Sequence, residues 1–133
     1  MHNEIITYYS KTPPNKGILE DADAIFWEEN RTCWDDLKVY LKIENNIIKK
    51  YSFEWDTAII TTACASVFGE SIIWLEISEV FEFGYSYIEE LVEMPISDRR
   101  KQASVLGLLT TRNALHEYLK DWKKDVFDDV LNI

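Results

Sequence analysis

The sequence predicts an α+β fold, in which a three-stranded antiparallel sheet is covered on one face by helices. Strand patterns are confined to residues 22–55, where apolar and polar residues alternate. Helix patterns fill most of the chain after Asp56, including a mostly apolar segment from Ala58 to Trp74. Strands followed by helices are typical of a sheet with helices packed on one side. We therefore expect a single domain that covers residues 1–133.

The first elements are predicted from short local signals. Residues 3–10 mix polar and apolar side chains and favour a short helix. Pro13-Pro14 ends it, because proline lacks the amide proton and restricts the residue before it. Asn15-Lys16-Gly17 then supplies residues that are common in turns.

Three strands are predicted at residues 22–29, 36–44 and 47–55. The second strand is the most regular, because Leu37, Val39, Leu41 and Ile43 alternate with polar or charged residues. Asn45-Asn46 follows it, and asparagine tolerates the positive φ that tight hairpin turns require. These features predict an antiparallel meander.

Four helices are predicted after the sheet. Asp56 is a candidate cap for the apolar helix, since its carboxylate can accept the free amides of a first turn. A short helix at 76–83 should end at Gly84, and Ser86 with Glu89 has the spacing of a capping box that opens the next one.

The last helix is expected to begin at Ser97-Asp98 and to be long. An apolar stripe at steps of three and four residues indicates the face that packs on the sheet. Its members are Leu108, Leu115, Leu119, Trp122 and Val126.

The charge balance restricts the class of partner. The chain has 24 acidic and 14 basic residues and a formal net charge of −10, so general binding to nucleic acid is not expected. Polar residues interrupt the longest apolar stretch, which argues against a membrane span. Two cysteines do not make a disulfide framework, and the start lacks the pattern of a signal peptide. We expect a cytoplasmic protein.

Several short motifs occur in an order that matches a known family. They are Pro14-Asn15-Lys16-Gly17-Ile18-Leu19-Glu20-Asp21-Ala22-Asp23-Ala24, Cys33-Trp34-Asp35, Leu41-Lys42-Ile43-Glu44, Phe53, Ala63-Cys64-Ala65-Ser66 and Arg99. In this order and spacing the chain resembles the NifU-like and IscU-like scaffolds of iron–sulfur cluster assembly, over about residues 12 to 115. The resemblance implies the sandwich fold of that family and a place in cluster assembly.

The resemblance also implies a ligand set. In that family three cysteines and an aspartate gather at one end of the sheet and hold a [2Fe–2S] cluster or a zinc ion, for which thiolates are suited. The first cysteine and the aspartate correspond to Cys33 and Asp35. The second cysteine, which follows a glycine, corresponds to Ala58 after Thr57. The third corresponds to Gln102, with Lys101 at the position before it.

These substitutions predict that the metal site is degenerate. Alanine has no donor atom, and lysine and amide side chains are poor ligands for these metals, so Cys33 and Asp35 alone are insufficient. Trp34 stands where the family has glycine and should fill space near the site. Cys64 lies six residues beyond Ala58 on the apolar helix and should face elsewhere, as a buried core residue.

Some residues leave alternatives open. Cys33 is either a reactive thiol that accepts persulfide, with Lys101 lowering its pKa, or a vestigial surface cysteine. Asp35-Asp36 is either a remnant of the ligand set or a turn that opens a strand. His2 and His116 are expected at the surface.

The sequence therefore predicts a divergent scaffold-family protein rather than an enzyme, since no catalytic motif is present. We expect it to carry no cofactor as purified and to act by binding a cysteine desulfurase or another iron–sulfur assembly protein. The alternative is an interaction or small-ligand module that reuses the fold without metal, because function depends on the site and not on the fold.

Overall fold

The computed structural model describes residues 3–32 and 34–133. Its elements in chain order are α1 (Glu4–Lys11), β1 (Ala24–Asn30), β2 (Asp35–Glu44), β3 (Ile47–Glu54), α2 (Ile59–Ser71), α3 (Ile77–Val80), α4 (Tyr85–Val92), the 3-10 helix η1 (Asp98–Arg100), α5 (Lys101–Leu119) and α6 (Phe127–Leu131). The predicted α+β class is confirmed.

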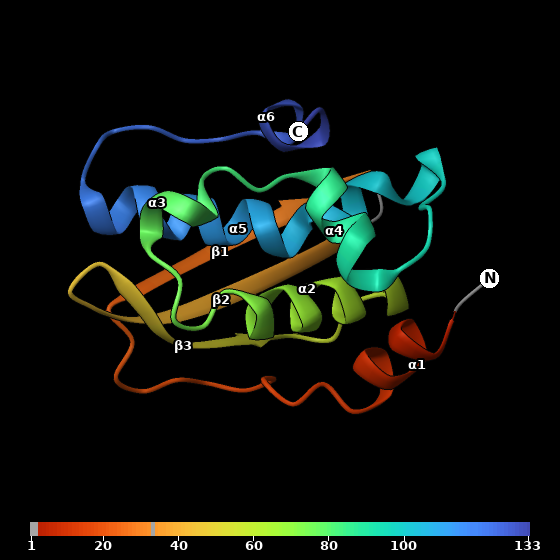
Figure 1. Ribbon diagram of the computed structural model, residues 1–133, viewed down its shortest axis with the longest axis horizontal. Helices are drawn as coiled ribbons and strands as arrows, with labels where there is room; N and C mark the ends of the chain where they lie inside the picture. The colour runs from red at the N-terminus through yellow and green to blue at the C-terminus, as the bar shows by residue number, and fades with distance from the viewer. Residues whose placement is uncertain (1–2, 33) are drawn as a thin grey trace.

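The sheet is the predicted meander. Its strand order is β1-β2-β3 with both pairings antiparallel (Figure 1), and the observed strand ends differ from the predicted ones by at most two residues. Asn45 and Asn46 form the hairpin turn with φ of 53° and 62°. The turn therefore uses the tolerance of asparagine for positive φ.

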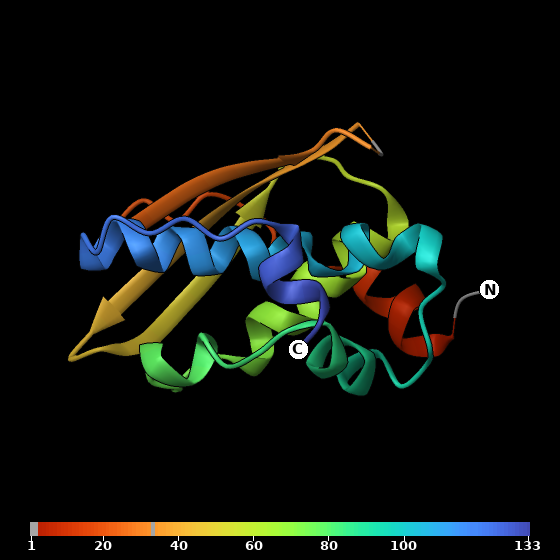
Figure 2. The ribbon, with the colours of Figure 1, turned by 90° about the horizontal axis from the view of Figure 1, so that it is seen from above.

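Two helices, α2 and α5, cover the same face of this sheet (Figure 2). The inward residues Leu37, Val39 and Leu41 of β2 are fully buried beneath them. The helices approach each other closely at Gly107 of α5, where a Cβ atom would lie 2.8 Å from Ala65 of α2. Glycine is required there because any side chain would push the two helices apart.

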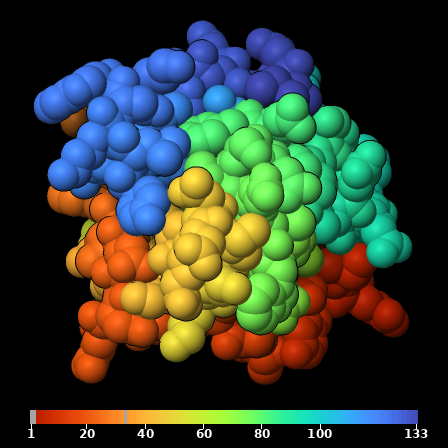
Figure 3. All heavy atoms as spheres, turned by 60° about the vertical axis from the view of Figure 1, so that its left-hand side comes forward, coloured from red at the N-terminus to blue at the C-terminus, as the bar shows by residue number. Residues whose placement is uncertain are grey.

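The edge strand β3 is joined to the segment that follows α2. The amide of Trp74 donates to the carbonyl of Ile48 at 2.7 Å, and the amide of Ile48 donates to the carbonyl of Leu75 at 2.9 Å. The hairpin and this segment lie side by side on the surface (Figure 3). Part of the strand edge is thereby covered.

Two predicted helix signals are wrong. Asp56 does not cap α2, since Ala58 is the N-cap residue, and the exposed Asp56 carboxylate pairs with Lys16 Nζ at 2.7 Å. Gly84 does not end a helix but precedes α4 as its N-cap residue. A Cβ atom on Gly84 would lie 2.5 Å from Ile133, so the glycine makes room for the C-terminal segment.

The capping box predicted at Ser86 and Glu89 is also absent. Ser86 lies inside α4, and its amide donates to the carbonyl of Ile133 at 2.9 Å. The Glu89 carboxylate accepts from the Tyr85 hydroxyl at 2.8 Å and from the Ile96 amide at 3.3 Å. Glu89 therefore does not cap the helix but connects α4 to the segment that contains Ile96.

The stripe predicted for the last helix is right only in part. Leu108 and Leu115 are fully buried, but α5 ends at Leu119, and Trp122 and Val126 lie beyond it with exposed side chains. The helix ends because Lys120 adopts a left-handed conformation. From there the chain turns back along α5, and we call residues 120–133 the C-terminal segment (Figure 1).

His116 is buried rather than exposed, contrary to the prediction, and it fixes the C-terminal segment. Its Nδ1 lies 2.8 Å from an Asp121 carboxylate oxygen and its Nε2 lies 2.9 Å from one of Asp125. Arg112 Nε donates to the same Asp125 oxygen at 2.8 Å. Asn113 adds two bonds to the backbone of Asp125, at 2.7 and 3.0 Å.

No helix in the described part of the chain is long and apolar enough to cross a bilayer.

Candidate functional site at the starts of helices α2 and α5

A cavity of about 510 Å³ opens where β2 begins and where α2 and η1 come together. Its walls are Thr32, Asp35, Ala58, Ile59, Ile60, Arg99, Arg100 and Ala103. Three of the predicted site residues, Asp35, Ala58 and Arg99, therefore line one cavity although they lie far apart in the sequence.

Asp35 is buried at the first position of β2 and is already engaged by protein groups. One carboxylate oxygen accepts from the amide of Ala58 at 3.3 Å, and the other accepts from the hydroxyl of Thr61. The carboxylate thus holds the start of α2, the role that the sequence suggested for Asp56. A metal bound by Asp35 would have to compete with these bonds.

The position that corresponds to the second cysteine offers no ligand. Ala58 is exposed with a methyl side chain, at the N-cap of α2. The Thr57 hydroxyl lies 2.6 Å from that of Thr62. Hydroxyls that are bonded to each other are not replacements for a thiolate.

Lys101 and Gln102 form the beginning of α5. Lys101 Nζ lies 3.3 Å from an Asp98 carboxylate oxygen and 4.8 Å from the centre of the Tyr85 ring. Burial and the hydrogen bond to Glu89 raise the pKa of Tyr85 to about 12, so this ring stays neutral. Gln102 is half-buried on the first turn of α5. Lys101 is therefore engaged by η1 and α4, and Gln102 is a neutral amide.

Trp34 is 92% exposed and has a φ of 55°, a conformation that favours glycine. The same holds for Trp74, which is largely exposed with a φ of 74°. The family resemblance assigns glycine to the position of Trp34. The backbone keeps a glycine-like conformation while presenting a large apolar side chain to solvent, at a cost of roughly 1 kcal/mol or more each.

Of the two cysteines, the structure describes the environment of Cys64. Cys33 lies outside the described residues, so its proposed roles stay predictions. Cys64 is buried in α2, and burial raises the pKa of its thiol to about 12. A thiol in this setting is inert, in agreement with its predicted place in the core. Among residues 3–32 and 34–133, no three His, Cys, Asp or Glu side chains lie together as a metal site.

Asn30 is a feature that the sequence did not reveal. It pairs with Asp35 across the first two strands, and only 1% of it is exposed. Neither polar atom of its side chain has a hydrogen-bond partner within the described part of the chain. Unpaired buried amides are rare and need an explanation. The one signal in the sequence is that the first strand ends in a polar residue close to the predicted site.

The comparisons with known proteins agree with the geometry. A family model described as the NifU-like N terminal domain matches residues 1–125. The chain is 35% identical over 94 residues to the iron–sulfur cluster assembly scaffold protein IscU of Thermotoga maritima, covering 71% of the chain and 63% of the relative. It is 29% identical over 72 residues to the zinc-dependent sulfurtransferase SufU of Bacillus subtilis, covering 54% and 48%. The matched part thus spans less than two thirds of each relative.

Solved structures share the fold. One is an iron–sulfur cluster assembly scaffold protein for the SUF system from Fervidobacterium islandicum, with a TM-score of 0.76 and 22% identity, covering 86% of this chain and 96% of the other. Another is a NifU-like protein from Brucella abortus, with a TM-score of 0.74 and 16% identity, covering 90% and 94%. At these identities the similarity establishes the arrangement of elements and not the chemistry.

Proposed function

Because this chain belongs to the NifU-like N-terminal domain family, we propose that it acts in or beside iron–sulfur cluster assembly by binding a partner, without holding a cluster itself. The family includes IscU and SufU relatives whose names describe scaffolds and a sulfurtransferase. Membership of the family supports a role in iron–sulfur cluster assembly. The substitutions at the site support a role in which this member does not hold the cluster itself.

The observation that carries the proposal is the use of Asp35. Its two carboxylate oxygens are bonded to the amide of Ala58 and the hydroxyl of Thr61, so the retained aspartate already has a structural role. Ala58 has no donor, and Gln102 offers an amide in place of a thiolate. The residues present do not fit a [2Fe–2S] cluster or a zinc ion, which need about four ligands with soft donors preferred.

The same end of the molecule has the character of a binding surface. Trp34, next to Asp35, and Ile59, at the start of α2, are exposed, and Arg99 and Arg100 line the same cavity as Asp35 and Ile59. Exposed aromatic and arginine side chains are enriched where proteins bind one another. A cysteine desulfurase or another iron–sulfur assembly protein is the partner class that we propose.

Reconstitution tests the claim about the metal. Iron, sulfide and reductant are added without oxygen to the wild-type protein, to a Cys64→Ser variant and to an Ala58→Cys, Gln102→Cys variant. Visible cluster absorption should be absent from the first two proteins and should appear only in the third. A cluster or tight zinc on monomeric wild-type protein would refute the proposal. Binding only by a dimer would favour ligands shared between subunits.

A binding measurement tests the partner separately. The desulfurase of the same organism is titrated with wild-type protein and with Trp34→Ala and Ile59→Ala variants, using Ile18→Ala as an exposed control. We expect affinity to fall roughly tenfold for one or both site variants and to be unchanged for the control. Equal affinity in all four proteins would exclude this surface as the contact.

A second candidate function is a small-ligand module without metal, and Asn30 is the observation that favours it. A cavity of about 380 Å³ is lined by Glu29, Asn30, Arg31, Trp34, Asp35 and Asp36. Both polar atoms of the Asn30 side chain are buried without a partner among the described residues, so a ligand that hydrogen-bonds this amide would have to displace the side chains that cover it. Asn30→Leu separates the two candidates, because it should abolish such binding and leave the desulfurase affinity unchanged.

A further inference from the structure

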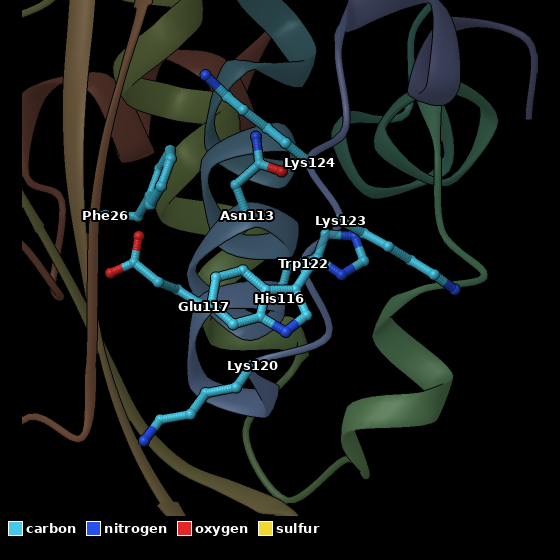
Figure 4. A pocket seen from close by; sticks show the side chains of 8 residues that line it. All are labelled: Phe26, Asn113, His116, Glu117, Lys120, Trp122, Lys123 and Lys124. Carbon is cyan, nitrogen blue, oxygen red and sulfur yellow. The ribbon is translucent and has the colours of Figure 1, made fainter.

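A second pocket lies toward the opposite end of α5, roughly 15–20 Å along the helix axis from the candidate site. It has a volume of about 490 Å³ and lies between Phe26 of β1 and the first residues of the C-terminal segment (Figure 4). Its walls are Phe26, Asn113, His116, Glu117, Lys120, Trp122, Lys123 and Lys124. We call it the Trp122 pocket.

Trp122 combines an unfavourable backbone conformation with an exposed apolar side chain. Its side chain is 97% exposed, and its φ of 65° lies in the left-handed region that a bulky residue rarely adopts. Both features cost free energy, because a positive φ strains a residue with a Cβ atom and an exposed indole leaves apolar surface in water. Strain and apolar exposure that persist together point to a binding role.

The loop that carries Trp122 is held firmly by hydrogen bonds. The amide of Lys123 donates to Asp121 at 2.9 Å, and Asp121 is bound by His116 at 2.8 Å. On the other side, Asp125 is fixed by Asn113 and Arg112. The tryptophan is thus presented on a preorganised support, which reduces the entropy lost on binding.

The charges around the pocket are positive in a chain that is strongly negative. Three lysine side chains point outward around it, and Glu117 is its only exposed carboxylate among the lining residues (Figure 4). Lys120 and Lys123 form no ion pair with any residue in the described ranges, and Lys124 Nζ is 3.9 Å from a Glu28 oxygen. Asp121 and Asp125 are hydrogen-bonded to His116, and the charge of Lys123 contributes to lowering the pKa of Asp121, so Asp121 offsets part of the positive charge.

We propose that the Trp122 pocket binds an acidic segment of a partner protein. An apolar side chain of that segment enters between Phe26 and Trp122, and neighbouring carboxylates pair with Lys120, Lys123 and Lys124. Charge complementarity selects this occupant, because three lysines surround an apolar pocket in a chain whose net charge is −10. The proposal does not depend on the function of the site around Asp35.

The test uses the whole protein and a synthetic peptide of one phenylalanine flanked by three glutamates on each side. Binding is followed by NMR through the indole N–H signals of the five tryptophans, with Trp122 assigned by its loss in Trp122→Phe. We expect the Trp122 signal to shift on titration and the affinity to fall at least about tenfold in Lys120→Gln, Lys123→Gln. Raising the salt concentration should weaken binding in parallel.

Matched controls come from another face of the molecule. Trp74 is also exposed with a positive φ, and Lys49 lies 4.2 Å from its ring. Trp74→Ala and Lys49→Gln, Lys50→Gln should leave the affinity for the peptide within about twofold of wild type. Trp122→Ala should weaken it roughly tenfold.

Four outcomes would overturn the proposal. One is the absence of any Trp122 shift at millimolar peptide, and another is equal loss of affinity in the pocket variants and the control variants. The third is equal or tighter binding of a lysine-flanked peptide or a single-stranded DNA oligonucleotide, which would assign the pocket to a different class. A concentration-dependent dimer that the acidic peptide does not dissociate, with Trp122 at its interface, would assign the pocket to a second copy of this chain.

Discussion

The two ends of helix α5 use carboxylates in different ways. At its start, the buried Asp35 accepts from a backbone amide and a hydroxyl and forms no ion pair with any residue that the structure describes. At its far end, Asp125 lies between Arg112 and His116 in a charged network. The first arrangement stabilises the start of α2 with a residue that the family resemblance assigned as a ligand. The second secures a segment that neither family motif nor helical periodicity predicts.

Removing the carboxylate at the far end should have the larger effect, because it takes a shared acceptor from two buried side chains. Asp125→Ala should lower the free energy of unfolding by about 2–3 kcal/mol, since Arg112 Nε and His116 Nε2 would both lose their bond to this carboxylate. Urea denaturation followed by circular dichroism measures this. Asp98→Asn is the matched control, because it breaks the exposed pair with Lys101 and should cost less than about 0.5 kcal/mol.

Removing the carboxylate at the start of α5 should cost less. Asp35→Ala should lower the free energy of unfolding by about 1–2 kcal/mol, because the hydroxyl of Thr61 is left buried without an acceptor. The neighbouring Asp36, which is half-exposed, should tolerate alanine within about 0.5 kcal/mol. If Asp35→Ala were as mild as Asp36→Ala, the carboxylate would not be structural and would be free to bind a metal.

A third substitution should raise stability. Trp34→Gly should increase the free energy of unfolding by about 0.5–1 kcal/mol, because glycine adopts a φ of 55° without strain and the exposed indole loses little packing. Trp27→Gly, in strand β1, should instead destabilise the protein. Thermal unfolding of both variants tests this, and a destabilised Trp34→Gly would show that the indole packs in solution.

Acid should loosen the far end of α5 first. Burial raises the pKa of Asp125, but hydrogen bonds and charge from Arg112 and His116 outweigh burial and hold the pKa below its usual range. The pKa of Asp121 is also lowered, where bonds from the Lys123 amide and His116 outweigh partial burial. An unfolded Asp titrates near pH 3.9. This stabilisation is therefore fully present above about pH 4 and is lost as the pH falls through the lower folded values.

NMR spectra recorded between about pH 6 and pH 2.5 follow this transition residue by residue. Signals of residues 120–126 should move to disordered positions at a higher pH than those of β2. Simultaneous loss of both sets would contradict a separate role for the carboxylates. Asp125→Asn should show the loosened segment throughout the range.

Prediction from the sequence succeeded where a local pattern determines the structure. The alternation in β2, the Asn45-Asn46 turn and the apolar segment that forms α2 each specify their element through neighbouring residues. The spacing of Ser86 and Glu89 failed because the Glu89 carboxylate is taken by Tyr85 and Ile96, a contact between separate turns. The same reason explains the wrong prediction for Asp56. The start of α2 is held instead by Asp35, which comes from β2 and is distant in the sequence.

The candidate site was predictable only through the family resemblance, which assigned roles to Asp35, Ala58 and Gln102 that periodicity cannot supply. The family resemblance assigned no role to the residues at the far end of α5. His116 looked like a surface residue because its two acceptors follow a left-handed turn at Lys120 that breaks the helical pattern. No rule of spacing predicts that the chain reverses there and buries the imidazole.

The central claim is that this member of the family does not hold a metal or cluster by itself. Its most direct test is the iron, sulfide and zinc content per chain of protein purified without oxygen, with the oligomeric state measured on the same sample. We predict less than about one tenth of an equivalent of each on monomeric protein, because Ala58 and Gln102 leave the ligand set incomplete. One zinc, or two irons with two sulfides, on each monomeric chain would contradict the account.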